Sequence, residues 1–261
     1  MNLAVKPRAS QADNRPDHIS EAEWRVRTDL AAFYRLVHHY GMSMLVYNHI
    51  TARVPGPDHH FLINEYGLSY EEITASNLVK VDLDGNVVDG SGREINPAGY
   101  IIHSCVHRAR KDLTCVAHTH SRAGVAVSCL KEGLIPMNQE GLQFHKRIAY
   151  HDYEGVALRL EERERLVASL GNREAMVLRN HGLLTTGATI AECFNNMYRL
   201  ERACQLQVMA LSCNTELQLP PQEVTQYTNN LMLPGVRRRF GLLEWPAMLR
   251  KLDRTDPSYR D

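Results

Sequence analysis

Apolar residues recur at helical intervals in four stretches of the chain. The first follows a capping-box pattern, Ser20 with Glu23 three positions later, which is typical of a helix start. The predicted helices span residues 21–39, 98–110, 161–170 and 189–212. In the last of them the periodic apolar side chains are expected to face the core: Phe194, Met197, Leu200, Cys204, Leu206, Met209 and Ala210.

Shorter apolar runs between these helices predict strands. One hairpin is marked by Asp84-Gly85 between two alternating runs, which is a strong short-range turn signal. The predicted extended segments are 44–54, 61–63, 78–83 with 87–88, 115–121, 134–137, 147–150, 175–178 and 183–187. Mixed helices and strands in 261 residues indicate one α/β domain with short tails. Residues 1–19 are expected to form a flexible arm, and residues 216–261 an irregular extension with one helix that packs on the domain or on a neighbouring subunit.

The amino-acid composition limits the class of protein and the kinds of partner that can be expected. Hydrophobic residues make up 44% of the chain, which is enough for a buried core, and 30 basic residues balance 30 acidic ones. This balance argues against nucleic-acid and membrane partners and leaves a small-molecule substrate. The six cysteines lie in apolar segments without a Cys-x-x-Cys pair, which favours buried free thiols in a reducing compartment. With no secretory signal or long apolar run in the sequence, we expect a cytoplasmic protein.

The most informative stretch contains His118 and His120. Because alternate side chains of a strand point to the same face, the His-x-His spacing aims both imidazoles in one direction. His181, after the apolar run 175–178, offers a third donor, and Gly182 would let the backbone turn sharply there. The prediction is a three-histidine metal site with positions open to substrate or water. The alternative is that these are hydrogen-bonded or surface histidines without a metal.

Other polar residues are candidates for substrate contacts. Asn48, Thr51 and Arg53, with His49 between them, could bind a substrate anion, or they could form a polar sheet edge. Gly67, in the loop after the strand 61–63, is a further candidate for substrate binding. A four-residue spacing places His103 and His107 on one helix face, where metal binding is possible but flanking the core is more common.

Four motifs in order resemble the class II aldolase/adducin family over about residues 25–215, so the family domain is assigned to residues 20–215. They are Asn96-Pro97-Ala98-Gly99-Tyr100-Ile101-Ile102-His103, Ala117-His118-Thr119-His120-Ser121, Tyr150-His151-Asp152-Tyr153-Glu154-Gly155 and Leu178-Arg179-Asn180-His181-Gly182-Leu183-Leu184. The resemblance implies a three-layer α/β/α fold around a mainly antiparallel sheet, and a homotetramer with active sites between subunits. It also implies that His118, His120 and His181 bind a divalent cation, with zinc first and manganese, cobalt or iron as alternatives. In such aldolases the metal acts as a Lewis acid that stabilises an enediolate.

One departure from the family pattern matters for function. The sugar-phosphate aldolases carry an acid/base glutamate where this chain has Gly99, and two phosphate-binding serines where it has Pro97 and Ala98. Glycine cannot move a proton, and proline and alanine offer no hydroxyl. Ordinary phosphosugar aldolase activity is therefore not expected. The residues that could move a proton instead are Glu65, Glu140, His145 and Tyr153.

Three functions follow from the resemblance and its departure. The first is a metal-dependent lyase that performs a retro-aldol cleavage of a small non-phosphorylated hydroxy-carbonyl compound through a metal-stabilised enolate. The second is a metal-dependent decarboxylase of an aromatic or hydroxy acid, in which Arg53, His49 or Arg179 would anchor a carboxylate. The third is a non-catalytic, adducin-like assembly domain.

Overall fold

A seven-stranded sheet forms the centre of the molecule in the computed structural model, which describes residues 15–56, 59–155, 162–233 and 235–261. The expected N-terminal arm lies mostly outside these residues. The strand order is β3-β2-β1-β4-β7-β6-β5, and every neighbouring pair is antiparallel except β5 with β6. The strands are β1 His49–Arg53, β2 Phe61–Ile63, β3 Val79–Val81, β4 Cys115–Thr119, β5 Ile148–His151, β6 Ala175–Leu178 and β7 Gly182–Gly187. This arrangement confirms the predicted mainly antiparallel α/β fold.

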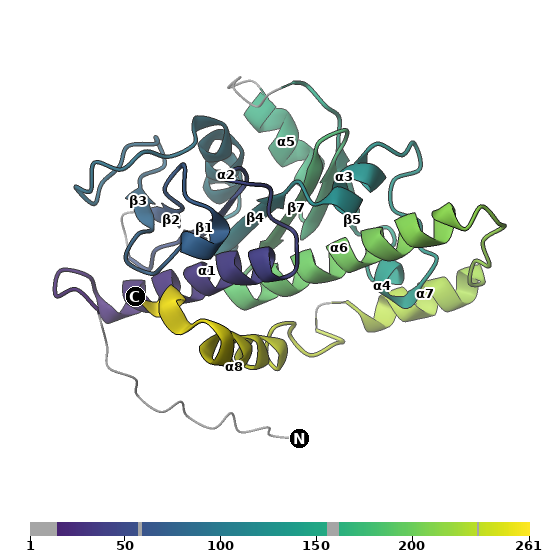
Figure 1. The fold of residues 1–261 in the computed structure, drawn as a ribbon. Helices are drawn as coiled ribbons and strands as arrows, with labels where there is room; N and C mark the ends of the chain where they lie inside the picture. The colour runs from purple at the N-terminus through teal and green to yellow at the C-terminus, as the bar shows by residue number, and fades with distance from the viewer. Residues whose placement is uncertain (1–14, 57–58, 156–161, 234) are drawn as a thin grey trace.

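Helices cover both faces of the sheet, which makes three layers (Figure 1). One face is covered by α1 Glu21–His39, α3 Arg122–Ser128 and α6 Ile190–Ser212, and the other by α2 Pro97–Ala109 and α5 Glu162–Leu170. Alternation along β4 supplies both cores, because Cys115 and Ala117 pack on the α1 and α6 side and Val116 on the α2 and α5 side. Two short helical segments, η1 Tyr70–Glu72 and α4 Gln139–Leu142, lie in connections.

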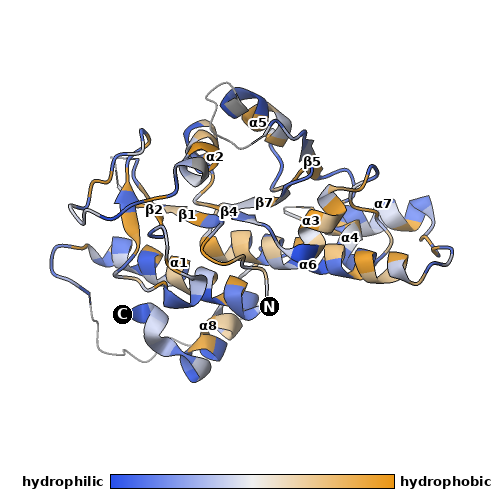
Figure 2. Cartoon of the chain, turned by 45° about the horizontal axis from the view of Figure 1, so that its top comes forward, coloured by the Kyte–Doolittle hydropathy of each residue, from blue (hydrophilic) through white to orange (hydrophobic). Residues whose placement is uncertain are grey.

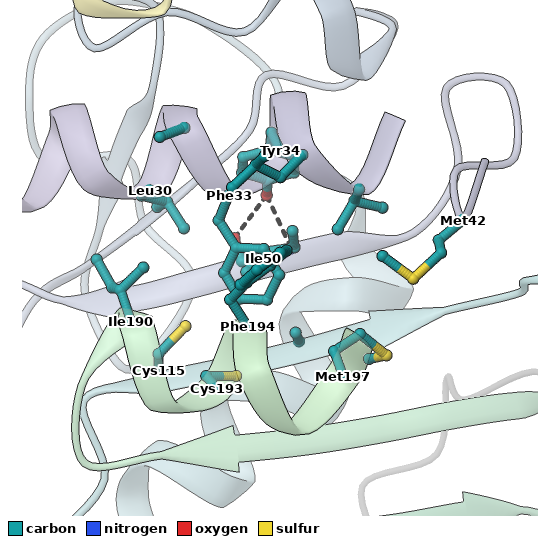
Figure 3. Packing of buried hydrophobic residues seen from close by; sticks show 14 of the residues in the cluster. Leu30, Phe33, Tyr34, Met42, Ile50, Cys115, Ile190, Cys193, Phe194 and Met197 are labelled. Atoms are coloured by element: carbon teal, nitrogen blue, oxygen red, sulfur yellow. Dashed lines mark hydrogen bonds between the residues drawn. The ribbon is translucent and has the colours of Figure 1, made fainter. Parts of the chain in front are cut away.

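The larger core lies between the sheet and α1 with α6 (Figure 3). Tyr34 and Phe33 of α1 are fully buried there, and Phe33 meets Phe194 edge to face with ring centroids 5.4 Å apart. The Tyr34 hydroxyl donates to the Ile50 carbonyl at 2.5 Å and accepts from the Ile50 amide at 2.8 Å. A side chain of α1 therefore holds the first residues of β1, next to His49.

The segment after residue 215 is more regular than the sequence suggested. Instead of one helix it contains α7 Gln222–Leu231, α8 Glu244–Thr255 and the 3₁₀ turn η2 Pro257–Arg260. Figure 1 shows α8 against α1, and Figure 2 shows that α8 carries both hydrophobic and hydrophilic residues. Tyr259 is fully buried, and its carbonyl accepts a hydrogen bond from the Ala75 amide at 3.0 Å. The prolines before these helices obscured a helical pattern in Trp245, Leu249 and Leu252, which are buried.

Several local predictions need correction. The strand expected at 44–54 is formed only at His49–Arg53, since Leu45 has a φ of 48° and Asn48 a φ of 74°. Residues 134–137 form no strand, and Met209 is 64% exposed instead of facing the core. All six cysteines are free, as expected, but Cys129 and Cys213 are exposed. Within the described residues no helix is both long and apolar enough to cross a membrane.

Candidate metal centre

Three imidazoles converge beside the end of β4. His118 lies in β4, and His120 follows that strand. His181 lies in the turn between β6 and β7, and β7 pairs with β4. The possible ligand atoms of the three rings all lie within 4.8 Å of one another, and the ring centroids are 4.6 to 4.7 Å apart. Among the residues that the structure describes, these three histidines form the group of side chains whose donor atoms lie close enough together to hold one metal ion.

The turn that delivers His181 works differently from the prediction. The left-handed backbone conformation belongs to Asn180, with φ 55°, and asparagine tolerates it well. Gly182 is needed for another reason, because a Cβ there would lie 2.4 Å from the Thr119 carbonyl oxygen and 3.2 Å from Cδ2 of His120. The absence of a side chain lets β7 approach β4 where His120 leaves the strand.

The protonation of the three histidines suits a cation. Burial, with the neighbouring imidazoles, holds the pKa of His118 well below its usual range, and burial lowers the pKa of His181 to about 4. The pKa of His120 is also lowered by burial. Neutral rings keep a lone pair free for a metal. Nδ1 of His118 lies 2.9 Å from the Leu183 carbonyl, so it donates there and leaves Nε2 as the ligand atom, 2.9 Å from Nε2 of His120. The donor set fits a divalent cation such as zinc.

The predicted substrate-binding residues fall in different surroundings. Asn48 is buried beside the triad, where its side-chain oxygen accepts from the His120 amide at 3.2 Å. Thr51 lies between two buried histidines, with its hydroxyl 2.7 Å from Nδ1 of His103 and 2.8 Å from Nε2 of His107. These contacts make that histidine pair part of the packing between β1 and α2.

Arg53 and Gly67 each have a local structural explanation. Arg53 donates to the carbonyl oxygens of His107, at 2.5 Å, and Leu113, at 3.4 Å. Gly67 is exposed in a loop with φ 100°. For Arg53 the described hydrogen bonds are therefore structural, and for Gly67 the backbone conformation explains the glycine.

Position 99 is filled by a neighbouring ring. Gly99 is buried in the first turn of α2, and a Cβ built on it would lie 2.4 to 2.5 Å from Cε1, Cδ2 and Cγ of His49. His49 is 5% exposed, and its ring centroid lies 5.0 Å from that of His103 and 5.7 Å from that of His118. Burial lowers the pKa of His49 to about 3, so this ring is also neutral near pH 7.

Of the candidates for proton transfer, Tyr153 lies beside the triad. Its ring centroid is 6.2 Å from that of His181, and both residues line one small cavity with Arg179. Glu140 instead forms an ion pair with Arg199 of α6 at 3.5 Å.

The other two candidates make their contacts elsewhere. Glu65 forms an ion pair with Arg93 at 3.2 Å. His145 uses its backbone carbonyl to accept from the Asn229 side chain at 2.9 Å. The geometry around the imidazoles therefore points first to Tyr153.

Sequence reasoning missed two features of this centre. The spacing of residues gave no sign that His49 packs against Gly99, because the two belong to a strand and a helix far apart in the chain. The Leu183 carbonyl that orients His118 is a backbone group and leaves no trace in residue type. Pairing β4 with β7 would have revealed it, since Leu183 is two residues after His181.

Comparison with known proteins agrees with this architecture. Residues 28–208 match the family model described as the class II aldolase and adducin N-terminal domain. An aldolase II superfamily protein from Pseudomonas syringae has a similar structure, with a TM-score of 0.88, 50% identity, and coverage of 94% of this chain and 98% of that one. An L-fuculose 1-phosphate aldolase from Glaciozyma antarctica PI12 has a TM-score of 0.81, 27% identity, and coverage of 95% and 97%. Alpha-adducin of Rattus norvegicus is 39% identical over 92% of this chain, which corresponds to 35% of the adducin.

Proposed function

Because this chain belongs to the class II aldolase and adducin family, we propose that it is a metal-dependent lyase acting on a carbon–carbon bond of a small, non-phosphorylated hydroxy-carbonyl compound. The observation that carries the proposal is the convergence of His118, His120 and His181, whose donor atoms lie within 4.8 Å. Three neutral imidazoles can hold a divalent cation while leaving it charged and open to oxygen ligands. Zinc is the cation we expect first, and the sites are expected to lie between subunits of a homotetramer.

The residues around the triad have separate tasks in this proposal. When bound, the cation supplies Lewis-acid charge that stabilises the electron pair released by the breaking bond. The Leu183 carbonyl fixes the ring of His118, and Asn48 fixes the backbone at His120. Tyr153 is the residue that we propose moves the substrate proton, since its ring is 6.2 Å from that of His181 and a phenol can give or take a proton.

Decarboxylation of a hydroxy acid is a second candidate, favoured by the packing at position 99. With His49 against Gly99, no acid/base side chain fits at that point of α2, and loss of carbon dioxide needs no prior removal of a proton. Arg179, which lines the cavity shared with His181 and Tyr153, would then anchor the carboxylate.

The similarity to alpha-adducin supports a third candidate, a non-catalytic assembly domain. Metal analysis separates it from the two enzymes. Purified protein should contain about one divalent cation per chain if the triad is a metal centre. His118→Ala and His120→Ala should abolish that loading, and His145→Ala, which alters a partly buried histidine elsewhere, should not. Wild-type protein that takes up no zinc or manganese would contradict both enzyme proposals.

Product analysis separates the two reactions. A panel of hydroxy acids is incubated with the zinc-loaded protein, and release of aldehyde is measured beside release of carbon dioxide. Retro-aldol cleavage predicts aldehyde, and Tyr153→Phe should slow it by about 100-fold or more because the phenol proton is lost. Carbon dioxide from the same panel, with Tyr153→Phe unaffected, would establish the decarboxylase instead.

A further inference from the structure

The buried contact between β1 and the first turn of α2 restricts what can lie beside the metal ligands. Three ring atoms of His49 lie within 2.4 to 2.5 Å of the point where a Cβ at position 99 would stand. Carbon atoms in van der Waals contact are about 3.5–4.0 Å apart, so the ring and any side chain at position 99 exclude each other. The volume next to Gly99 therefore belongs to His49.

The His49 ring cannot easily move away from this place. In the pairing of β1 with β4, His49 lies opposite His118, and their ring centroids are 5.7 Å apart. On another side His103 of α2 lies 5.0 Å away, and its Nδ1 is bound by the Thr51 hydroxyl at 2.7 Å. With only 5% of His49 exposed, a rotation of the ring would displace packed neighbours.

The ring covers a part of α2 that would otherwise suit an anion. The first turn of a helix carries amide groups without helical partners and the positive end of the helix dipole, which together favour phosphate. In α2 this turn begins at Pro97, which has no amide hydrogen, and it reaches Gly99, where the His49 ring packs. A buried ring, packed on one side against His118, thus covers this turn at Gly99.

We propose that His49 is a specificity-determining residue, which keeps phosphorylated substrates away from the three-histidine centre by covering the first turn of α2 beside Gly99. The proposal deepens the lyase function given above and rests on it for the role of the centre. Substrates without a phosphate group at the end that faces this turn are expected to bind, and those with a phosphate group there are expected to be rejected.

Stability measurements test the steric part without any activity. Gly99→Ala should lower the urea midpoint strongly in the presence of His49, and much less in the His49→Ala background, where the ring is gone. Equal losses in the two backgrounds would show that the ring does not hold this volume. If Gly99→Ala does not fold, recovery of folded protein in the double variant is the result expected, and failure to recover would overturn the proposal.

Ligand binding tests the specificity part. Glycolate and 2-phosphoglycolate, which differ by the phosphate group, are titrated into zinc-loaded protein by calorimetry. His49→Ala should raise the affinity for 2-phosphoglycolate by about tenfold or more, with that for glycolate changed less than about threefold. The matched control is His107→Ala, which removes an equally buried ring of α2 that stacks on Phe61. The proposal is refuted if His49→Ala does not raise the affinity for 2-phosphoglycolate relative to glycolate. It is also refuted if His107→Ala raises this relative affinity by the same factor.

The two proposals can fail separately. Absence of a metal in wild-type protein would remove the lyase function, and the stability comparison of Gly99 and His49 would still have a defined outcome. Conversely, the zinc-loaded wild-type protein could be active while His49→Ala shows the wild-type ratio of affinities for 2-phosphoglycolate and glycolate. That result would leave the lyase proposal standing and refute the role proposed for His49. His49→Asn, which is smaller but polar, carries the same expectation if the alanine variant does not fold.

Discussion

Loss of the Tyr34 hydroxyl should strongly destabilise the protein. The hydroxyl accepts hydrogen bonds from the Ile50 amide at 2.8 Å and from the Asn64 amide at 3.2 Å. Its own hydrogen is shared between two acceptors, the Ile50 carbonyl oxygen at 2.5 Å and the Asn64 side-chain oxygen at 2.8 Å. At this point β2 no longer pairs with β1, whose partner residues are Ala52 and Arg53. Tyr34 therefore supplies the hydrogen bonds that a neighbouring strand would otherwise give.

The size of the effect follows from these contacts. Tyr34→Phe leaves two buried amides without a partner, at about 1–3 kcal/mol each, and relieves the burial of one hydroxyl. We expect the free energy of unfolding to fall by about 2–4 kcal/mol. Urea unfolding followed by circular dichroism, at one protein concentration, measures this loss.

A second tyrosine of the same region provides the control. The Tyr40 hydroxyl is partly buried and donates only to the Met248 sulfur at 3.2 Å, so Tyr40→Phe should cost less than about 1 kcal/mol. Should Tyr34→Phe unfold within about 0.5 kcal/mol of wild type at an unchanged slope, the hydroxyl does not hold β1 and the reasoning is wrong.

Three further changes test other parts of the structure. Arg27→Met removes a guanidinium that donates to Glu23 at 2.8 Å and to the Leu78 carbonyl at 2.8 Å, and Lys80 at 2.9 Å remains as the partner of Glu23. This change should cost about 2–4 kcal/mol by urea unfolding, whereas Arg25→Met, at an exposed ion pair, should hardly matter. Gly182→Ala forces a Cβ into the β4 carbonyl and should reduce zinc loading measured by metal analysis. Burial lowers the pKa of His107 from 6.5 to about 3, so in that interval the unfolded state binds more protons and stability falls as pH falls, by up to about 1.4 kcal/mol per pH unit. Urea midpoints across that range should depend less on pH in His107→Gln.

Local patterns determined much of what could be predicted. The Ser20 side chain accepts from the Glu23 amide at 3.2 Å, and α1 begins at Glu21, as the capping-box pattern indicated. Helix α6 likewise has Thr189 as its N-cap. Such signals involve residues three or four positions apart, and the sequence shows them directly.

Features that depend on distant parts of the chain were harder to predict. The exposure of Met209 depends on where α6 extends past its neighbours, and its periodic spacing carried no information about that. The candidate metal triad joins His118 with His181, which the sequence offered as a third donor far along the chain and which the resemblance to a known family supported. The pairing of β4 with β7 is what brings the two rings together. For the packing of His49 on Gly99, neither periodicity nor motif gave a signal, since contact between two elements decides it.

The register of β1 connects the core to the metal centre. Ile50 and Ala52 pack on the α1 and α6 side, so His49 and Thr51 must point to the α2 side, where His118 also lies. A shift of β1 by one residue would place His49 in the larger apolar core and Ile50 among the buried histidines under α2, and burying a polar side chain without a hydrogen bond costs about 1–3 kcal/mol. Apolar packing thus fixes the register, and the register places the ring beside Gly99. Because Tyr34 binds Ile50, weakening that contact should loosen zinc binding as well as the fold, and equal zinc affinity in Tyr34→Phe and wild type would argue that the triad is held by β4 and β7 alone.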